Sequence, residues 1–212
     1  MEFGPAGGQG PGPVTASSGG PSASDAAAVA LQLGRAPRAL LAVAHRCPCG
    51  LPDVVETAPR LPDGTPYPTL YYLTCPRAVA AVSRLEAGGL MREMTQRIAA
   101  EPSLRQACDA AHRDYLARRD AAAAAAGLEP LPEGMQSAGG MPDRVKCLHA
   151  LVAHELAAPG VNVFGREALE AAGQWWSSGR CVPEPEETVP DTANEETVPE
   201  TVPEEMLPEE AE

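Results

Sequence analysis

Apolar residues recur at helical spacing over most of the chain, and only three short segments have the composition of strands. The expected helices are 25–33, 76–87, 90–100, 102–126, 142–157 and 166–176. The expected strands are 39–45, 54–57 and 69–74. Because three short strands cannot form a large sheet, we expect an α+β fold in which helices dominate and cover a small antiparallel sheet.

The two ends of the chain lack this pattern. Residues 1–24 contain seven Gly and four Pro, and residues 183–212 carry a Glu-Thr-Val-Pro unit three times. Such segments bury too little apolar surface to offset the entropy of ordering the chain. We therefore expect disordered tails at 1–24 and 183–212 around a single domain at 25–182, with Ser24 or Asp25 capping its first helix.

Charge is concentrated in the second tail. Residues 184–212 contain twelve acidic and no basic side chains, which leaves 17 acidic against 16 basic residues in the remainder. Neither part has the positive excess of a nucleic-acid-binding protein. No window of 18 apolar residues predicts a membrane span, and the start of the chain does not resemble a secretory signal. We expect a cytoplasmic chain with reduced cysteines.

Chemically unusual residues gather in three blocks. These are 45–52 (His-Arg-Cys-Pro-Cys-Gly-Leu-Pro), 67–76 (Tyr-Pro-Thr-Leu-Tyr-Tyr-Leu-Thr-Cys-Pro) and 144–154 (Arg-Val-Lys-Cys-Leu-His-Ala-Leu-Val-Ala-His). Together they hold four of the six cysteines, three of the four histidines and the only lysine.

The three blocks resemble a bacterial, mainly actinobacterial, family known as domain of unknown function 501. The resemblance covers about residues 36–176 and is carried above all by Arg-Val-Lys-Cys-Leu-His-Ala-Leu at 144–151. It implies no established activity. Genes of this family typically lie beside those of a septum-formation initiator and an exopolyphosphatase-like enzyme, which implies a partner in cell division or polyphosphate metabolism. The chain lacks the membrane span and the heptads of that initiator, so the septum label is not transferred.

The first hypothesis is a metal site. Cys47, Cys75 and Cys147, with His154 or Cys49 as the fourth ligand, would give a tetrahedral zinc site, and an iron–sulfur cluster fits the thiols equally well. If a helix starts at residue 142, Cys147 and His154 share a face but lie two turns apart, which strains their co-ligation. The alternative is that the cysteines are buried free thiols.

The second hypothesis is a site for a small anionic ligand. Gly139 and Gly140 lead into the expected helix at residue 142, where backbone N–H groups and the helix dipole favour an anion. Arg144 and Lys146 would add positive charge. The alternative is a plain flexible connector.

The third hypothesis is thiol catalysis. On a helix starting at residue 142, His149 points about 160° away from Cys147, so only His45 or His112 could serve that thiol as a base. Cys75, at a helix start that lowers the pKa of a thiol, is the better nucleophile. His149 itself is expected to be a histidine at the edge of the core.

The favoured prediction is a site lined by Cys and His that binds a metal or a small anion. The alternative, from a different functional class, is a non-catalytic adaptor protein with structural cysteines and an exposed apolar patch around Trp175 and Trp176. Whether the protein is an enzyme stays open, with a binding role favoured.

Overall fold

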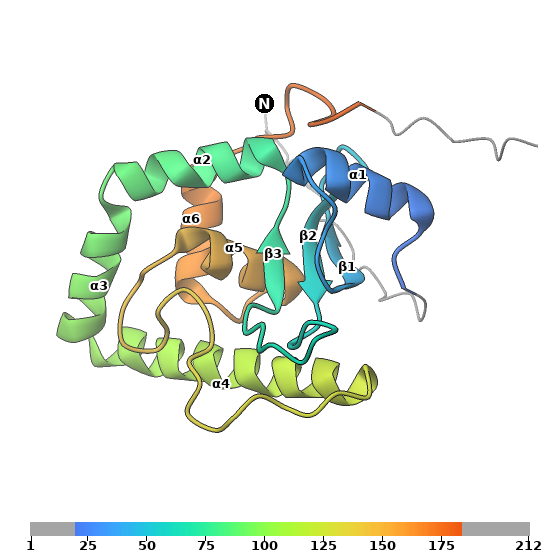
Figure 1. The fold of residues 1–212 in the computed structure, drawn as a ribbon. Helices are drawn as coiled ribbons and strands as arrows, with labels where there is room; N and C mark the ends of the chain where they lie inside the picture. Colours follow the sequence, from blue (N-terminus) through green and yellow to red (C-terminus); the bar gives the residue numbers. More distant parts are fainter. Residues whose placement is uncertain (1–19, 184–212) are drawn as a thin grey trace, which may run out of the picture.

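The computed structural model describes residues 20–183, in which six helices surround a three-stranded sheet (Figure 1). The elements are α1 (Ala23–Leu33), β1 (Leu40–Arg46), β2 (Pro52–Thr57), β3 (Tyr71–Leu73), α2 (Pro76–Ala87), α3 (Leu90–Ala100), α4 (Pro102–Ala125), α5 (Leu148–Ala157) and α6 (Val163–Ala172). The expected helix-dominated α+β fold is confirmed.

The sheet is antiparallel in the order β1-β2-β3. Val55 of β2 pairs with Val43 on one side and with Tyr72 on the other. Register shifts interrupt the β1–β2 ladder, as at β-bulges, which bend and twist a strand. Because β2 is the central strand, its residues are buried apart from the half-exposed Glu56.

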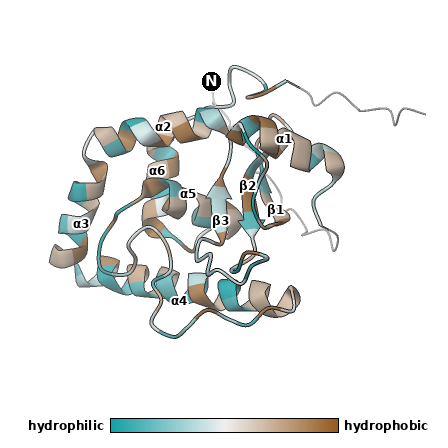
Figure 2. Cartoon of the chain, in the orientation of Figure 1, coloured by the Kyte–Doolittle hydropathy of each residue, from teal (hydrophilic) through white to brown (hydrophobic). Residues whose placement is uncertain are grey.

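The helices form a frame around the end of the sheet. In Figure 1, α2, α3 and α4 follow one another along three sides, and α5 and α6 lie between them, with α5 passing behind β3 and α6 lying beside α5 below α2. One hydrophobic core joins β3 to the inner faces of these helices. Hydrophilic and hydrophobic patches alternate along α4 in Figure 2, as expected for a helix with one buried side.

Several predicted boundaries are wrong by a few residues. The first helix begins at Ala23, and its N-cap is Ser22 instead of Ser24 or Asp25. Asp25 is the reciprocal partner in a capping box, since its carboxylate accepts the Ser22 N–H while its own N–H donates to the Ser22 hydroxyl. The last helix is Val163–Ala172, because the Asn162 side chain caps it at Gly165.

The largest boundary error concerns α5, which begins at Leu148 and not at residue 142. Residues 139–147 form a tight turn in which the Lys146 N–H donates to the Gly139 carbonyl (2.6 Å) and the Arg144 N–H to the Gly140 carbonyl (3.2 Å). Cys147 is the extended N-cap residue, with φ −153° and ψ 111°. The side-chain directions expected from a helix of 100° per residue across 142–147 are therefore wrong.

The two expected disordered tails lie almost wholly outside the described residues. Among residues 20–183, no helix combines the length and the apolar character that crossing a membrane requires.

Candidate metal centre

Three ligand-type side chains converge between α2 and the start of α5. The Cys147 sulfur, the His149 Nδ1 atom and a Glu86 carboxylate oxygen all lie within 4.8 Å of one another. Nδ1 is 3.8 Å from the sulfur and 3.1 Å from Glu86 Oε1. All three residues are partly buried, so the cluster is neither in the core nor on an open surface.

One face of α2 holds His149 in place. Val79, Ser83 and Glu86 follow one another at helical spacing, and each contacts the imidazole ring. Nε2 lies 3.2 Å from the Val79 carbonyl and 3.1 Å from the Ser83 hydroxyl. Glu86 Oε1 also accepts the Leu148 N–H at 2.7 Å, which satisfies a free donor at the start of α5.

These contacts fix the protonation of the ring. Because the Val79 oxygen can only accept, Nε2 carries a proton, and Nδ1 then faces a thiol and a carboxylate. The hydrogen bond to Cys147, together with Glu86 and against the effect of burial, raises the pKa of His149 to about 9. Nδ1 therefore lies between a thiol and a carboxylate, two groups that favour a positive charge beside them. Either a proton or a metal ion bound at Nδ1 can supply this charge.

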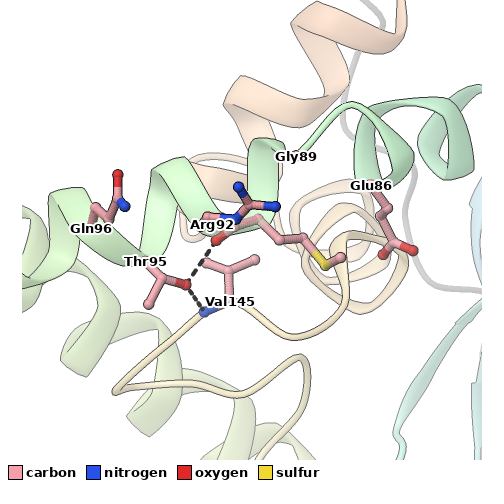
Figure 3. Close-up of a pocket in the computed structure, with 7 residues that line it drawn as sticks. Glu86, Gly89, Arg92, Thr95, Gln96 and Val145 are labelled. Atoms are coloured by element: carbon pink, nitrogen blue, oxygen red, sulfur yellow. Dashed lines mark hydrogen bonds between the residues drawn. The ribbon is translucent and has the colours of Figure 1, made fainter.

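Glu86 also lines a cavity of about 410 Å³ (Figure 3). The other lining residues are the glycine before α3, four residues of α3 and one residue before α5: Gly89, Met91, Arg92, Thr95, Gln96 and Val145. The Thr95 hydroxyl accepts the Val145 N–H at 3.0 Å, which joins α3 to the turn before α5. A small molecule in this cavity would thus lie beside one of the three ligand residues.

Comparison with known families gives one match. The sequence profile described as "Protein of unknown function (DUF501)" matches residues 43–170. The chain belongs to the DUF501 family. No curated protein and no solved structure matches the chain. The family assignment agrees with the resemblance carried by the three blocks, and it brings no activity, ligand or partner with it.

The structure of this DUF501 member divides the cysteines proposed as ligands between two places. Cys147 lies with Glu86 and His149, whereas Cys47, Cys49 and Cys75 lie near one another and near Cys181, at the end of the fold where β2 begins. Cys47, Cys75 and Cys147 therefore do not meet at one point.

His154, the expected fourth ligand, lies elsewhere. It is fully buried, it stacks on Tyr71 with ring centroids 6.1 Å apart, and its Nε2 lies 3.0 Å from Asp114. Its expected place on a polar face is wrong because α5 is enclosed by β3 and α6, which leaves it no open polar side.

The glycine turn differs from the site proposed for an anion. Gly139 and Gly140 precede a turn instead of a helix N-terminus, and the N–H groups of Arg144 and Lys146 are used inside this turn. The premise of the anion hypothesis, a helix that begins at residue 142, is wrong.

Two predictions about reactivity also need correction. Cys75 is the N-cap of α2, but burial raises the pKa of its thiol to about 12, so the helix dipole does not make it a thiolate. His149 was expected to point away from Cys147, yet the two are in contact because Cys147 is not helical. The proposed bases for a thiol have other partners: His45 pairs with Asp53 and His112 with Ser137.

Glu86 is the functional candidate that the sequence-based prediction missed. It lies in the last turn of α2, where a carboxylate is opposed by the negative end of the helix dipole. An acidic residue at that position does not stabilise the helix, and this is the only signal of Glu86 that the sequence carries.

Proposed function

We propose that this protein binds a divalent metal ion, zinc, through Cys147, His149 and Glu86. The observation that carries the proposal is the convergence of a sulfur, an imidazole nitrogen and a carboxylate oxygen within 4.8 Å. These are the three ligand types that zinc takes in proteins.

The spacing of the three atoms suits a tetrahedral ion. With zinc–ligand distances of about 2.3 Å for sulfur and about 2.0–2.1 Å for nitrogen and oxygen, a tetrahedron separates sulfur and nitrogen by about 3.5 Å and nitrogen and oxygen by about 3.3 Å. The corresponding distances are 3.8 and 3.1 Å. Each differs by only a few tenths of an ångström, which side-chain rotation supplies.

The outer contacts of His149 support a ligand role. A metal-bound histidine almost always donates its other ring N–H to a carbonyl or carboxylate, and the Val79 carbonyl fills this role for Nε2. A catalytic triad needs the opposite arrangement, with nucleophile and carboxylate at different ring nitrogens. Here Cys147 and Glu86 share Nδ1, so metal binding is favoured over thiol catalysis. A single thiolate cannot hold an iron–sulfur cluster, which favours zinc.

Three protein ligands leave a fourth position for water or a small molecule, as in catalytic zinc sites. Arg92 lines the cavity beside Glu86, so its charge and that of the metal would both favour an anionic ligand there. This is where we place the small anion expected from the sequence. Free thiols at all six cysteines suit the reducing cytoplasm.

The test is metal content, measured on protein purified without a metal-binding tag. We expect Cys147→Ser to lose one equivalent of zinc per chain, because serine keeps the N-cap of α5 and removes the sulfur ligand. Glu86→Gln keeps an oxygen that can accept the Leu148 N–H but removes the charge, and we expect it to weaken zinc binding by more than about tenfold.

Cys108→Ala is the matched control, because Cys108 is a buried cysteine of α4 that does not belong to the ligand cluster. It should keep the zinc content of the wild type. Unchanged zinc in folded Cys147→Ser and Glu86→Gln proteins would disprove this function.

A non-catalytic adaptor in cell division or polyphosphate metabolism stays the alternative from a different class. Within residues 20–183, Leu31 is the large hydrophobic side chain that is exposed, and Trp175 and Trp176 are half-buried against each other. The described surface therefore offers the adaptor hypothesis less support than the ligand cluster offers metal binding.

A further inference from the structure

Four cysteines from distant segments lie near one another at the end of the fold where β2 begins. The thiols of Cys47 and Cys49 lie close enough to influence each other's ionisation, as do those of Cys49 and Cys181 and those of Cys181 and Cys75. Cys47 and Cys75 are buried, whereas Cys49 and Cys181 are half-buried. This four-cysteine cluster contains neither Cys147 nor Cys108.

Backbone pairing brings the first three cysteines together. Cys47 opens the turn between β1 and β2, in which its N–H donates to the Leu51 carbonyl at 2.9 Å. Cys75 follows β3, and the Thr74 N–H donates to the Asp53 carbonyl at 2.8 Å. The β1–β2 turn and the end of β3 therefore lie side by side.

The segment after α6 brings the fourth cysteine. Arg77 donates to the Gly179 carbonyl at 2.8 Å, and Gln32 Nε2 lies 3.3 Å from the Cys181 sulfur and 2.6 Å from the Pro52 carbonyl. In Figure 1 this segment passes close to the start of α2 and to α1. It is thus fixed to α1, β2 and α2 at the point where the thiols gather.

Buried polar atoms without partners surround the same place. Five buried side-chain atoms in the described part of the chain lack a hydrogen bond, and three of them are Gln32 Oε1, Asp53 Oδ2 and Thr74 Oγ1. Each belongs to a residue that contacts or adjoins the four-cysteine cluster, and Asp53 acts electrostatically on Cys47. Asp53 Oδ1 pairs with His45 at 2.7 Å, but a buried carboxylate oxygen without a partner, here Oδ2, favours a cation close to these thiols.

We propose that Cys47, Cys49, Cys75 and Cys181 form a second metal site, which holds one zinc ion through four thiolates. Four cysteine ligands complete a tetrahedron, so this site is closed and structural, unlike the three-ligand centre at Cys147. The spacing of the ligands resembles no zinc ribbon, because the fourth comes from the far end of the domain.

Metal binding changes the geometry in a defined way. The four thiols are neighbours in pairs, and no three of their sulfurs lie within 4.8 Å of one another. Zinc at about 2.3 Å from each sulfur requires sulfur–sulfur separations of about 3.8 Å, so the four thiol groups must move closer together as the ion binds. The four thiol protons leave to solvent as the ion binds.

The experiment measures zinc and iron per chain in full-length protein purified under reducing conditions without a metal-binding tag. We expect two zinc ions in the wild type and one in Cys49→Ser or Cys181→Ser, whose side chains are half-buried and tolerate the change. Cys49→Ser/Cys147→Ser should hold none, and Cys108→Ala should hold two. After exchange for cobalt(II), Cys147→Ser should keep the strong sulfur-to-metal charge-transfer band of a multi-thiolate site, which Cys49→Ser should lose.

Three results would overturn the inference. They are wild-type zinc content in both Cys49→Ser and Cys181→Ser, iron in place of zinc, and a disulfide among the four cysteines in freshly isolated protein. The two sites fail independently, because loss of zinc in Cys147→Ser tests only the three-ligand centre.

Discussion

Gly165 lies where α6 passes closest to α5. A Cβ atom at this position would meet the Leu151 carbonyl oxygen and come within 2.8 Å of the Glu155 Cβ atom. Backbone cannot move aside as a flexible side chain can, so Gly165→Ala must push the two helices apart. We expect a loss of about 1–3 kcal/mol in the free energy of unfolding, measured by urea denaturation.

Gly88→Ala is the control, since an added Cβ there meets only carbonyl oxygens at 3.4 Å at the exposed end of α2. Equal effects of the two substitutions would contradict the close α5–α6 contact.

His154 makes stability depend on pH. Burial, against the opposing effect of Asp114, lowers the pKa of His154 below its usual value of about 6.5. The unfolded chain then binds more protons than the folded one below that pH, so stability decreases as pH falls through about 6.5 toward the lowered pKa. Urea denaturation at pH 7.5, 6.5 and 5.5 should show this decrease, and His154→Gln should make it smaller. An identical pH slope in the variant would contradict the assignment.

At the residue scale, the sequence singled out the block that contains Cys147 and His149, but it did not predict which of the block's residues lie together. Cys147 was an expected ligand and lies beside Glu86 and His149, whereas His149 was expected only at the edge of the core and the expected ligand His154 lies beside Asp114. The mutual orientation of Cys147 and His149 could not be predicted, because it depends on Cys147 having extended backbone angles one residue before the helix. Glu86 was missed because it contacts His149 only through the packing of α2 against α5, 63 positions apart in the sequence.

Tyr115 links α4 to the edge of the sheet. Its hydroxyl is fully buried and accepts the Leu70 N–H at 2.7 Å, just before β3. Tyr115→Phe leaves that buried donor without a partner, which costs about 1–3 kcal/mol. We expect this loss in the free energy of unfolding, together with faster amide hydrogen exchange at Leu70.

Tyr72→Phe offers a comparison, because Tyr72 is half-buried and stacks on Tyr67 with ring centroids 5.9 Å apart. Its effect should stay within about 0.5 kcal/mol. A Tyr115 effect as small as this would show that water or another group replaces the hydroxyl.

Elements were predicted well where capping and breaking residues mark their ends. The structure has α2 at Pro76–Ala87 and α3 at Leu90–Ala100, as the sequence indicates, because Pro76 suits a first turn and the glycine pair separates the helices. The start of α5 was missed because its apolar pattern extends back to Val145, which is buried in a turn. Periodicity alone does not separate a buried turn from a buried helix.

At the scale of the whole molecule, deleting the last 29 residues should have no effect on zinc content or stability, whereas a deletion that extends into the segment before them should lower zinc content. Every contact described above lies within residues 20–183. Deleting 184–212 removes twelve acidic residues and no basic ones, and we expect zinc content and urea midpoint to stay unchanged. Deleting 174–212 also removes Cys181 and should lower zinc by one equivalent, measured on protein that circular dichroism shows to be folded. Loss of folded protein after the shorter deletion would contradict the domain limits.

The pattern of apolar positions predicted the helix-dominated fold and the small sheet. It did not predict that Cys147 lies apart from the four-cysteine cluster. Cys181 received no role from the sequence, because it lies outside the three blocks and reaches the other thiols only through the path of the chain after α6. Long-range placement of this kind depends on the packing of α1 and α2, which local sequence does not encode.

The contact between Gln32 and Cys181 spans 149 positions of the chain. A metal ion bound beside it would act as a cross-link, and a cross-link that closes a long loop stabilises a protein by removing conformations from the unfolded ensemble. For a loop of about 100 residues this entropy is worth about 4.7 kcal/mol in the case of a disulfide. The availability of zinc would then set the free energy of unfolding of the chain.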